Sequence, residues 1–296
     1  MATASPVLTA TAAETQPKIR SQVRSKIDAP AALRVWHLTS LDAPTVALVW
    51  TLAFAWAARI ALPPWLPAVV ALAAWSMYIG DRLLDARTPR APLRERHRFH
   101  WRHRRIFLPI ALAAGCVAVT LVFRHMPAIA LERNSVLAAA ALAYLTTVHS
   151  PWRIAKLPRG LRIPKELLVG LLFTAACIAP AWFRGPASPV ALAVPGVGLV
   201  ALAWLNCHAI EAWESEQDGA RPIFRIAMVL AGAAWLAAMM AAGVGLRRIA
   251  ALLLAAAASA ALLALLDRGK RRLTPIALRA AADLVLLTPL ALLALK

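Results

Sequence analysis

Residues 106–123 read IFLPIALAAGCVAVTLVF, an apolar run without a single charged side chain. A helix needs about 20 mainly apolar residues to cross the hydrocarbon core of a bilayer, so this run is close to the required length. The stretch directly before it, residues 97–105, reads HRFHWRHRR and is strongly basic. An apolar run that follows a basic stretch is typical of a membrane helix that starts at the cytoplasmic face.

Further segments of the chain share this apolar character. Hydrophobic residues make up 61% of the sequence and charged residues only 16%, whereas a soluble domain is about half apolar and about a quarter charged. We therefore predict an all-α, polytopic membrane bundle of about nine transmembrane helices. The predicted spans are residues 41–62, 64–80, 106–123, 128–149, 167–183, 189–212, 223–243, 249–266 and 276–295.

The spans form one unit, because no polar stretch long enough for a soluble domain interrupts them. We expect a single transmembrane helical domain at residues 36–296. Residues 1–35 are rich in Ala, Thr, Ser, Lys and Arg. We expect them to form a disordered, basic cytoplasmic tail that suits contact with anionic lipid.

The net charge of +19 would suggest a nucleic-acid partner in a soluble protein. Here most of the 33 lysines and arginines lie in the tail and in alternate short connections between the predicted helices. This distribution follows the positive-inside rule and needs no nucleic acid. It predicts an integral protein of the bacterial inner (plasma) membrane, with the N-terminus in the cytoplasm and the C-terminus outside.

Acidic residues form two clusters at the predicted cytoplasmic ends of two helices, the second and the sixth. Asp81 and Asp85 are four residues apart, so both project from one face of a helix. Glu211, Glu214 and Asp218 are spaced by three and then four residues, which again places them on one face. Like charges stacked in this way repel one another unless a cation neutralises them.

Mg²⁺ is the natural partner for such clusters, because it prefers oxygen ligands and is often held by carboxylates together with substrate phosphates. The alternative is that the acids belong to solvated helix ends and pair with Arg82, Arg87, Arg221 or other arginines of the loops. Two clusters at equivalent ends of a helical array favour the metal.

The placement of the two clusters resembles that of the UbiA-type intramembrane prenyltransferases, which have nine membrane helices and aspartate-rich motifs after helices two and six. The spacing of Glu211, Glu214 and Asp218 matches the second motif, D-x-x-D-x-x-x-D, with Glu twice in place of Asp. Asp81 and Asp85 match the last two acids of the first motif, N-D-x-x-D-x-x-x-D. Met77 and Tyr78 stand where that motif has Asn and Asp.

A third similarity runs from Tyr144 to Pro164, Lys165, Glu166 and Gly170, a region similar to the Tyr-Pro-x-x-Lys-Arg…Gly segment after helix four of that family. The likeness extends over residues 41–295.

This resemblance implies transfer of an isoprenyl group from a prenyl diphosphate to a small-molecule or lipid acceptor, with Mg²⁺ as cofactor. It implies catalytic roles for Asp81, Asp85, Glu214 and Asp218, and a metal-binding role for these four and Glu211. Two other functions remain open: a UbiA-like protein that binds an isoprenoid or lipid without turnover, as Met77 and Tyr78 suggest, or a component of a membrane transporter.

Four further residues are candidates for substrate binding. Lys165 begins the fifth predicted helix and suits a diphosphate, although a lysine at that place also snorkels to the interface. Arg82 lies between the two acids of the first cluster, and Tyr78 lies one turn before Asp81. Asn206 lies within a predicted span, where a polar residue either lines a cavity or bonds to a neighbouring helix.

Two other polar groups have competing interpretations. Arg279 and Asp283 are four residues apart in the last predicted helix, and we expect an internal ion pair, with cavity lining as the alternative. His97, His100 and His103 recur every third residue, so they could bind a transition metal. The arginines among them instead favour a basic cap that contacts diphosphate or anionic headgroups.

Overall fold

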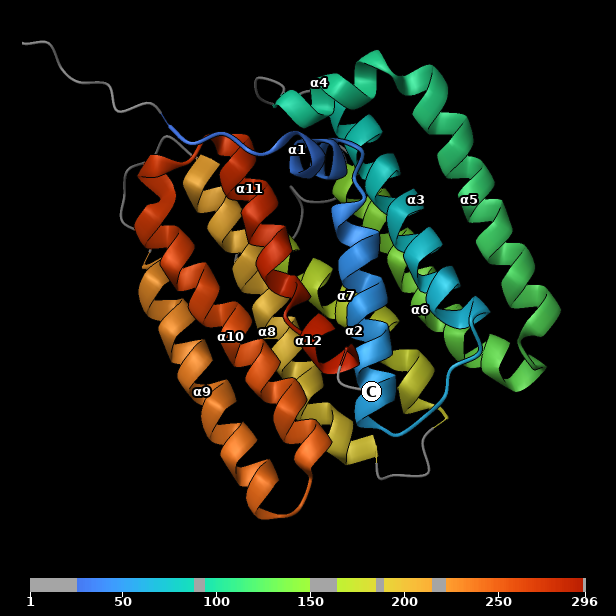
Figure 1. Cartoon of the computed structure of the whole chain (residues 1–296). Coiled ribbons are helices and arrows are strands. Elements are labelled where there is room, and N and C mark those ends of the chain that lie inside the picture. Colours follow the sequence, from blue (N-terminus) through green and yellow to red (C-terminus); the bar gives the residue numbers. More distant parts are fainter. Residues whose placement is uncertain (1–25, 88–93, 150–163, 185–188, 215–221, 295–296) are drawn as a thin grey trace, which may run out of the picture.

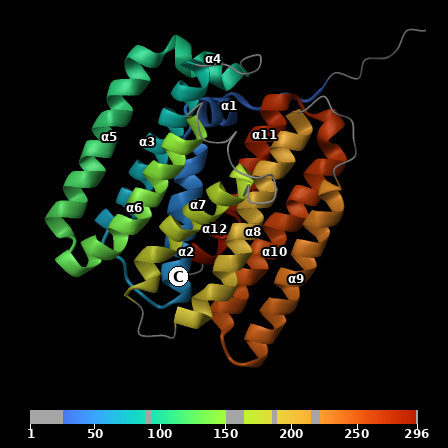
Figure 2. The ribbon, with the colours of Figure 1, turned by 180° about the vertical axis from the view of Figure 1, so that it is seen from behind.

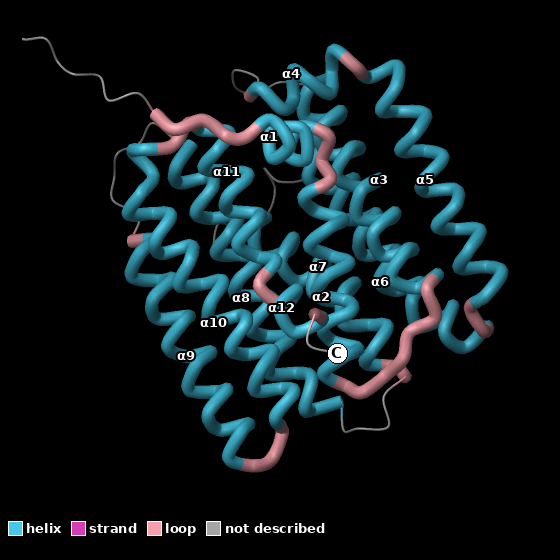
Figure 3. Tube along the Cα trace, in the orientation of Figure 1, coloured by secondary structure: helices cyan, strands magenta, loops and turns pink. Residues whose placement is uncertain are grey.

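The computed structural model describes residues 26–87, 94–149, 164–184, 189–214 and 222–294. Within these ranges every regular element is a helix, apart from one isolated bridge between Ile27 and Leu273 (Figure 3). The α-helices are α1 (Ala31–Leu38), α2 (Asp42–Ala57), α3 (Trp65–Arg87), α4 (Glu95–Arg102), α5 (Arg104–His125), α6 (Ala128–His149), α7 (Lys165–Trp182), α8 (Pro189–Glu214), α9 (Ile223–Gly243), α10 (Arg247–Gly269), α11 (Pro275–Leu284) and α12 (Leu290–Leu293).

The long helices stand roughly side by side, with α2 and α7 in the centre (Figure 1). Helices α3, α5 and α6 lie on one flank of this centre, and α8, α9, α10 and α11 lie on the other, as the view from behind also shows (Figure 2). The short helices α1 and α4 lie across one end of the bundle, which we call the capped end. Helices α3 and α8 both finish there.

Seven helices among the described residues are long and apolar enough to cross a membrane, as expected for an integral membrane protein. The count rises to eight if α1 and α2, which meet at 88°, form one broken span. The predicted span 64–80 forms most of α3, which is not among these seven. Its last two turns carry Asp81, Arg82, Asp85 and Arg87, which lower its hydropathy.

Part of the predicted tail is structured, contrary to our expectation. Residues 31–38 form α1, and Ile27 is hydrogen-bonded to the segment before α11, through Ile27 N–H to Arg272 O (2.7 Å) and Thr274 N–H to Ile27 O (2.9 Å). This pairing gives the backbone of Ile27, just before α1, a partner that the composition of the segment does not reveal. Residues 1–25 lie outside the described residues.

The predicted last span, 276–295, is broken between α11 and α12. Pro289 cannot continue an α-helix, because it has no N–H and its ring clashes with the carbonyl of Val285, four residues earlier. Ser259 Oγ donates to that carbonyl (2.7 Å), and Trp50 Nε1 donates to the carbonyl of Leu286 (3.0 Å). Side chains from α10 and α2 therefore satisfy the backbone groups that the break exposes, as a membrane interior requires.

Small residues allow close helix packing in the rest of the bundle. Alanines recur at every third or fourth position along the buried face of α9, where α9 packs against α10. At Gly170 in α7, an added Cβ would lie 3.0 Å from the carbonyl oxygen of Val200 and 3.3 Å from the amide nitrogen of Trp204 in α8. Such small-residue interfaces are typical of helices that associate in a bilayer.

Candidate active site

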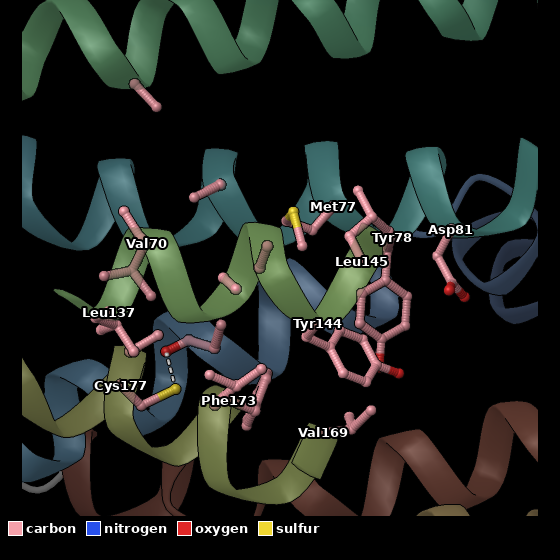
Figure 4. A pocket seen from close by; sticks show the side chains of 18 of the residues that line it. Val70, Met77, Tyr78, Asp81, Leu137, Tyr144, Leu145, Val169, Phe173 and Cys177 are labelled. Atoms are coloured by element: carbon pink, nitrogen blue, oxygen red, sulfur yellow. Dashed lines mark hydrogen bonds between the residues drawn. The ribbon is translucent and has the colours of Figure 1, made fainter. Parts of the chain in front are cut away.

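One cavity of about 1060 Å³ lies inside the bundle, between α2, α3, α5, α6, α7, α8 and α11, with residues of the α4 segment at one end. Most of its wall is apolar, and its charged side chains come from the ends of α3, α7 and α8, from the α4 segment and from α11. Figure 4 shows Tyr78 and Tyr144 between Asp81 and the apolar part of the wall, where Leu137 and Cys177 lie. The cavity is therefore amphipathic: a long apolar chamber with a charged end.

The first acidic cluster and one acid of the second cluster line this cavity. Asp81 and Asp85 near the end of α3, and Glu211 near the end of α8, all line it. These helices are distant in sequence and lie on opposite flanks of the bundle, but both end at its capped end (Figure 1). Asp85 Oδ2 also lies 3.8 Å from His97 Nε2 of α4.

Glu214 is surrounded by arginines instead of lining the cavity. It accepts a hydrogen bond from Arg279 Nη1, forms an ion pair with Arg94 Nη1, and lies 3.8 Å from Arg96 Nη1. Arg94 Nη2 also donates to Glu211 Oε2 (3.3 Å). The second cluster thus has arginine partners, as the alternative interpretation expected, and among the described residues these come from the α4 segment and from α11.

Asp218, the last acid of the second motif, lies outside the described residues, as do Glu216 and Arg221. The structure therefore unites the acids of the first cluster with the first acid of the second.

The basic segment before α5 forms α4 and covers the charged end of the cavity, as expected for a cap. Arg94, Arg96 and His97 from this segment line the cavity. An ion pair between Arg34 of α1 and Glu95 (2.6 Å) holds the first turn of α4.

The three histidines of this segment face different partners. His100 Nδ1 donates to the carbonyl of Arg96 (2.8 Å), so its Nε2 accepts from the buried Ser40 Oγ (3.2 Å). His103 Nδ1 donates to the carbonyl of Phe99 (2.9 Å), and His97 Nε2 accepts from Arg96 Nε (3.3 Å). Within the described residues these histidines do not form a metal-binding group.

Burial lowers the pKa of two of these imidazoles. The pKa of His97 falls to about 3, because burial disfavours its charged form and Arg96 adds repulsion. Burial lowers the pKa of His100 to about 4, and Arg82 adds to the effect. Both histidines are therefore neutral at pH 7.

All four predicted substrate-binding residues, Lys165, Tyr78, Arg82 and Asn206, line the cavity. The Arg82 guanidinium lies 5.7 Å from the centroid of the Tyr78 ring. Arg82 is 4% exposed and Asn206 is 5% exposed. Nonetheless Arg82 Nη1 and Asn206 Oδ1 have no hydrogen-bond partner in the part of the chain that the structure describes.

The predicted ion pair between Arg279 and Asp283 is wrong. Arg279 bonds to Glu214, whereas Asp283 accepts from Asn206 Nδ2 (3.1 Å) and lies 3.6 Å from His37 Nδ1. Both residues have closer partners on other helices, and both line the cavity, which was the alternative.

Asp42 was missed in the sequence. It is 2% exposed and has His37 and Arg82 as neighbours. A charged residue at the start of a long apolar segment was the signal that could have revealed it, because such residues are costly in a bilayer.

Searches against models of protein families, against curated proteins and against solved structures find no match for this chain.

Proposed function

We propose that this protein is a UbiA-like membrane prenyltransferase, which moves an isoprenyl group from a prenyl diphosphate to a small-molecule or lipid acceptor. One observation carries the proposal: carboxylates from the ends of α3 and α8 line the charged end of a single cavity whose remaining wall is apolar. A prenyl diphosphate has the same division, with a charged head and an apolar tail.

The proposal includes Mg²⁺, and the donors at the charged end suit this ion. Asp81, Asp85 and Glu211 offer carboxylate oxygens, which are the ligands that Mg²⁺ prefers. Glu214 is engaged by arginines, and its predicted metal role, like that of Asp218, stays a prediction. When bound, Mg²⁺ neutralises charge on the diphosphate leaving group.

The protein's own side chains supply the remaining functions. Lys165, Arg82 and Arg96 offer cationic donors for diphosphate oxygens at the cavity wall. The apolar wall binds the isoprenyl chain and excludes water, which protects a reactive allylic group from hydrolysis. Tyr78 and Tyr144 lie where the head and tail of the donor would join.

The same proposal implies how many helices span the membrane and which end of the bundle faces the cytoplasm. Counting α3 and the bent α1–α2 pair as spans, in addition to the seven helices above, gives the nine of the UbiA pattern. The capped end then faces the cytoplasm of a bacterium, where the positive-inside rule puts the basic α4 segment.

A second candidate is a UbiA-like protein that binds an isoprenoid or polar lipid without turnover. Two observations favour this candidate. Arginines pair with Glu211 and Glu214, and Met77 and Tyr78 replace the Asn and Asp that begin the first motif. A transporter component is less favoured, because the acids lie at one end of the cavity and transporter sites are usually near the bilayer midplane.

The test uses purified protein in nanodiscs with Mg²⁺, labelled prenyl diphosphates of several chain lengths, and a lipid extract and small phenols as acceptors. Release of diphosphate with a labelled product supports the enzyme, and Asp81→Asn and Asp85→Asn should abolish it. Asp267→Asn, an acid paired with Lys270 outside the cavity, is the matched control. Saturable binding without diphosphate release supports the second candidate, and absence of binding excludes both.

A further inference from the structure

A second polar constellation lies behind the cavity wall and includes none of the motif acids. His37 ends α1, Asp42 begins α2, and Asp283 lies in α11. His37 and Asp42 are each 2% exposed, and the Asp283 side chain is 18% exposed and lines the cavity. One ligand atom from each residue lies within 4.8 Å of the other two.

Hydrogen bonds orient both carboxylates toward the imidazole. Asp42 Oδ1 accepts from the N–H of Ala43 (2.8 Å), and its Oδ2 lies 2.7 Å from His37 Nδ1. Asp283 Oδ1 accepts from Asn206 Nδ2 (3.1 Å), and its Oδ2 lies 3.6 Å from the same nitrogen. Each carboxylate thus has one oxygen fixed and the other directed at a common point, as in metal sites whose ligands are held by outer hydrogen bonds.

The charges at this point are unequal without a further cation. Two carboxylates face one arginine, and Arg82 Nη2 lies 3.8 Å from Asp42 Oδ2 without forming a hydrogen bond. A buried carboxylate such as that of Asp42 is strongly destabilising unless neutralised. A proton on His37 or on Asp283 supplies one positive charge here, and a bound divalent metal ion supplies two.

We propose that His37, Asp42 and Asp283 bind a divalent transition-metal ion. An imidazole nitrogen with two carboxylate oxygens suits Mn²⁺, Co²⁺, Fe²⁺ or Zn²⁺ more than Mg²⁺, which prefers oxygen alone. The N···O separations in the structure are 2.7 and 3.6 Å, on either side of the spacing of about 3.3 Å between ligands placed about 2.1 Å from one tetrahedral ion.

A separate observation also indicates a ligand. Asn206 is only 5% exposed, and its Oδ1 has no hydrogen-bond partner among the described residues. The residue lines the cavity, as Asp283 does. The cavity reaches Asp283, so an ion has a route to the site. Bound there, it would join α1, α2 and α11 and hold the 88° bend between α1 and α2.

The proposal is tested by adding Co²⁺ to the chelator-treated, full-length protein without a histidine tag. With millimolar Mg²⁺ present to occupy the carboxylates of the cavity, we expect one equivalent of Co²⁺ to bind with visible d–d absorption and Zn²⁺ to displace it. The melting temperature should rise with Co²⁺ concentration, because the ion binds only the folded state. Asn206→Leu, which removes a hydrogen bond to a ligand, should weaken binding by about 10- to 100-fold.

His37→Gln and Asp283→Asn should abolish binding, while the matched controls His103→Gln and Asp267→Asn should retain it. The titration of the wild-type protein tests for the metal site even if a variant fails to fold. No uptake by the wild type, or equal uptake by the His37→Gln variant, would overturn the proposal and leave a buried ion-pair network with the proton on His37. Neither result depends on prenyl transfer.

Discussion

Arg94 reaches across the charged end of the cavity to Glu211, with its Nη2 at 3.3 Å from the Oε2 of the glutamate. The two residues are 117 positions apart in sequence. Through this contact and its ion pair with Glu214, Arg94 joins the α4 segment to the end of α8 and closes the capped end.

Replacement of Arg94 should therefore open the cap. We expect Arg94→Gln to weaken binding of a prenyl diphosphate about tenfold or more, because the α4 segment that covers the charged end loses its contacts with Glu211 and Glu214, and a hydrogen bond to a charged group contributes about 1.5–3 kcal/mol. Limited proteolysis of α4 should accelerate in parallel. Arg98→Gln, on the exposed side of α4, is the control and should change neither quantity.

The docking of α4 should depend on pH. The pKa of His97 is about 3 and that of His100 about 4 in the folded protein, against about 6.5 in an unfolded chain. The unfolded chain therefore binds protons first, so stability is complete above about pH 6.5 and falls as the pH drops toward 4 and then 3.

Hydrogen exchange of the α4 amides, compared at pH 7.5 and pH 5, measures this effect. Exchange corrected for its intrinsic pH dependence should be faster at pH 5. His100→Gln should reduce the difference between the two pH values, while His125→Gln should not. Equal protection at both pH values would contradict the expected effect of burial on these imidazoles.

Close contact of α7 and α8 predicts a strong effect at Gly170. A Cβ there would lie 3.0 Å from a backbone oxygen and 3.3 Å from a backbone nitrogen, so the helices must separate. We expect Gly170→Ala to destabilise the protein by about 1–3 kcal/mol, as overpacking usually does. Gly232→Ala in α9, where no atom lies within 4 Å of the added carbon, should leave the melting temperature nearly unchanged.

The apolar end of the cavity should set the length of the bound chain. Leu137 lines this part of the wall (Figure 4). We expect Leu137→Trp to shift the preferred prenyl diphosphate toward shorter chains, because the indole fills part of the chamber. Leu142→Trp, on the same helix but 59% exposed and outside the cavity lining, should leave the preference unchanged. Binding measured over a series of chain lengths separates the two outcomes.

Much of the fold follows from hydropathy, because a long apolar run in lipid must satisfy its backbone within a helix. Each of the nine predicted spans overlaps a helix of the structure. Hydropathy gave no indication of α1, whose place depends on contacts with distant residues such as Asp283, nor of the exact route of the chain at Pro289. Pro289 could be read from the sequence, but the break in the helix also needs Ser259 and Trp50 as donors to the backbone carbonyls that it exposes.

The site was predictable where helical spacing alone determines which side chains share a face. Asp81, Asp85 and Glu211 line one cavity because α3 and α8 both end on the same side of the bundle. Partner choice was not predictable: Arg279 lies one turn from Asp283 in sequence, yet it pairs with Glu214 on another helix. Such pairs depend on helix rotation and packing, which no local spacing encodes. For the same reason the sequence did not indicate that Asp42 of α2 lies close to Asp283 of α11.

The bridge between Ile27 and Leu273 constrains the order in which the protein can be made. Asp28 also bonds to Thr274, 246 residues later, and His37 meets Asp283. Until α11 has been made, α1 can contact α4 and His37 can contact Asp42, but Ile27, Asp28 and His37 still lack their partners near the C-terminal end of the chain. The segment that begins at Ile27 can therefore reach its final place only after α11 has been made, so we expect a truncation before Pro275 to destabilise the protein.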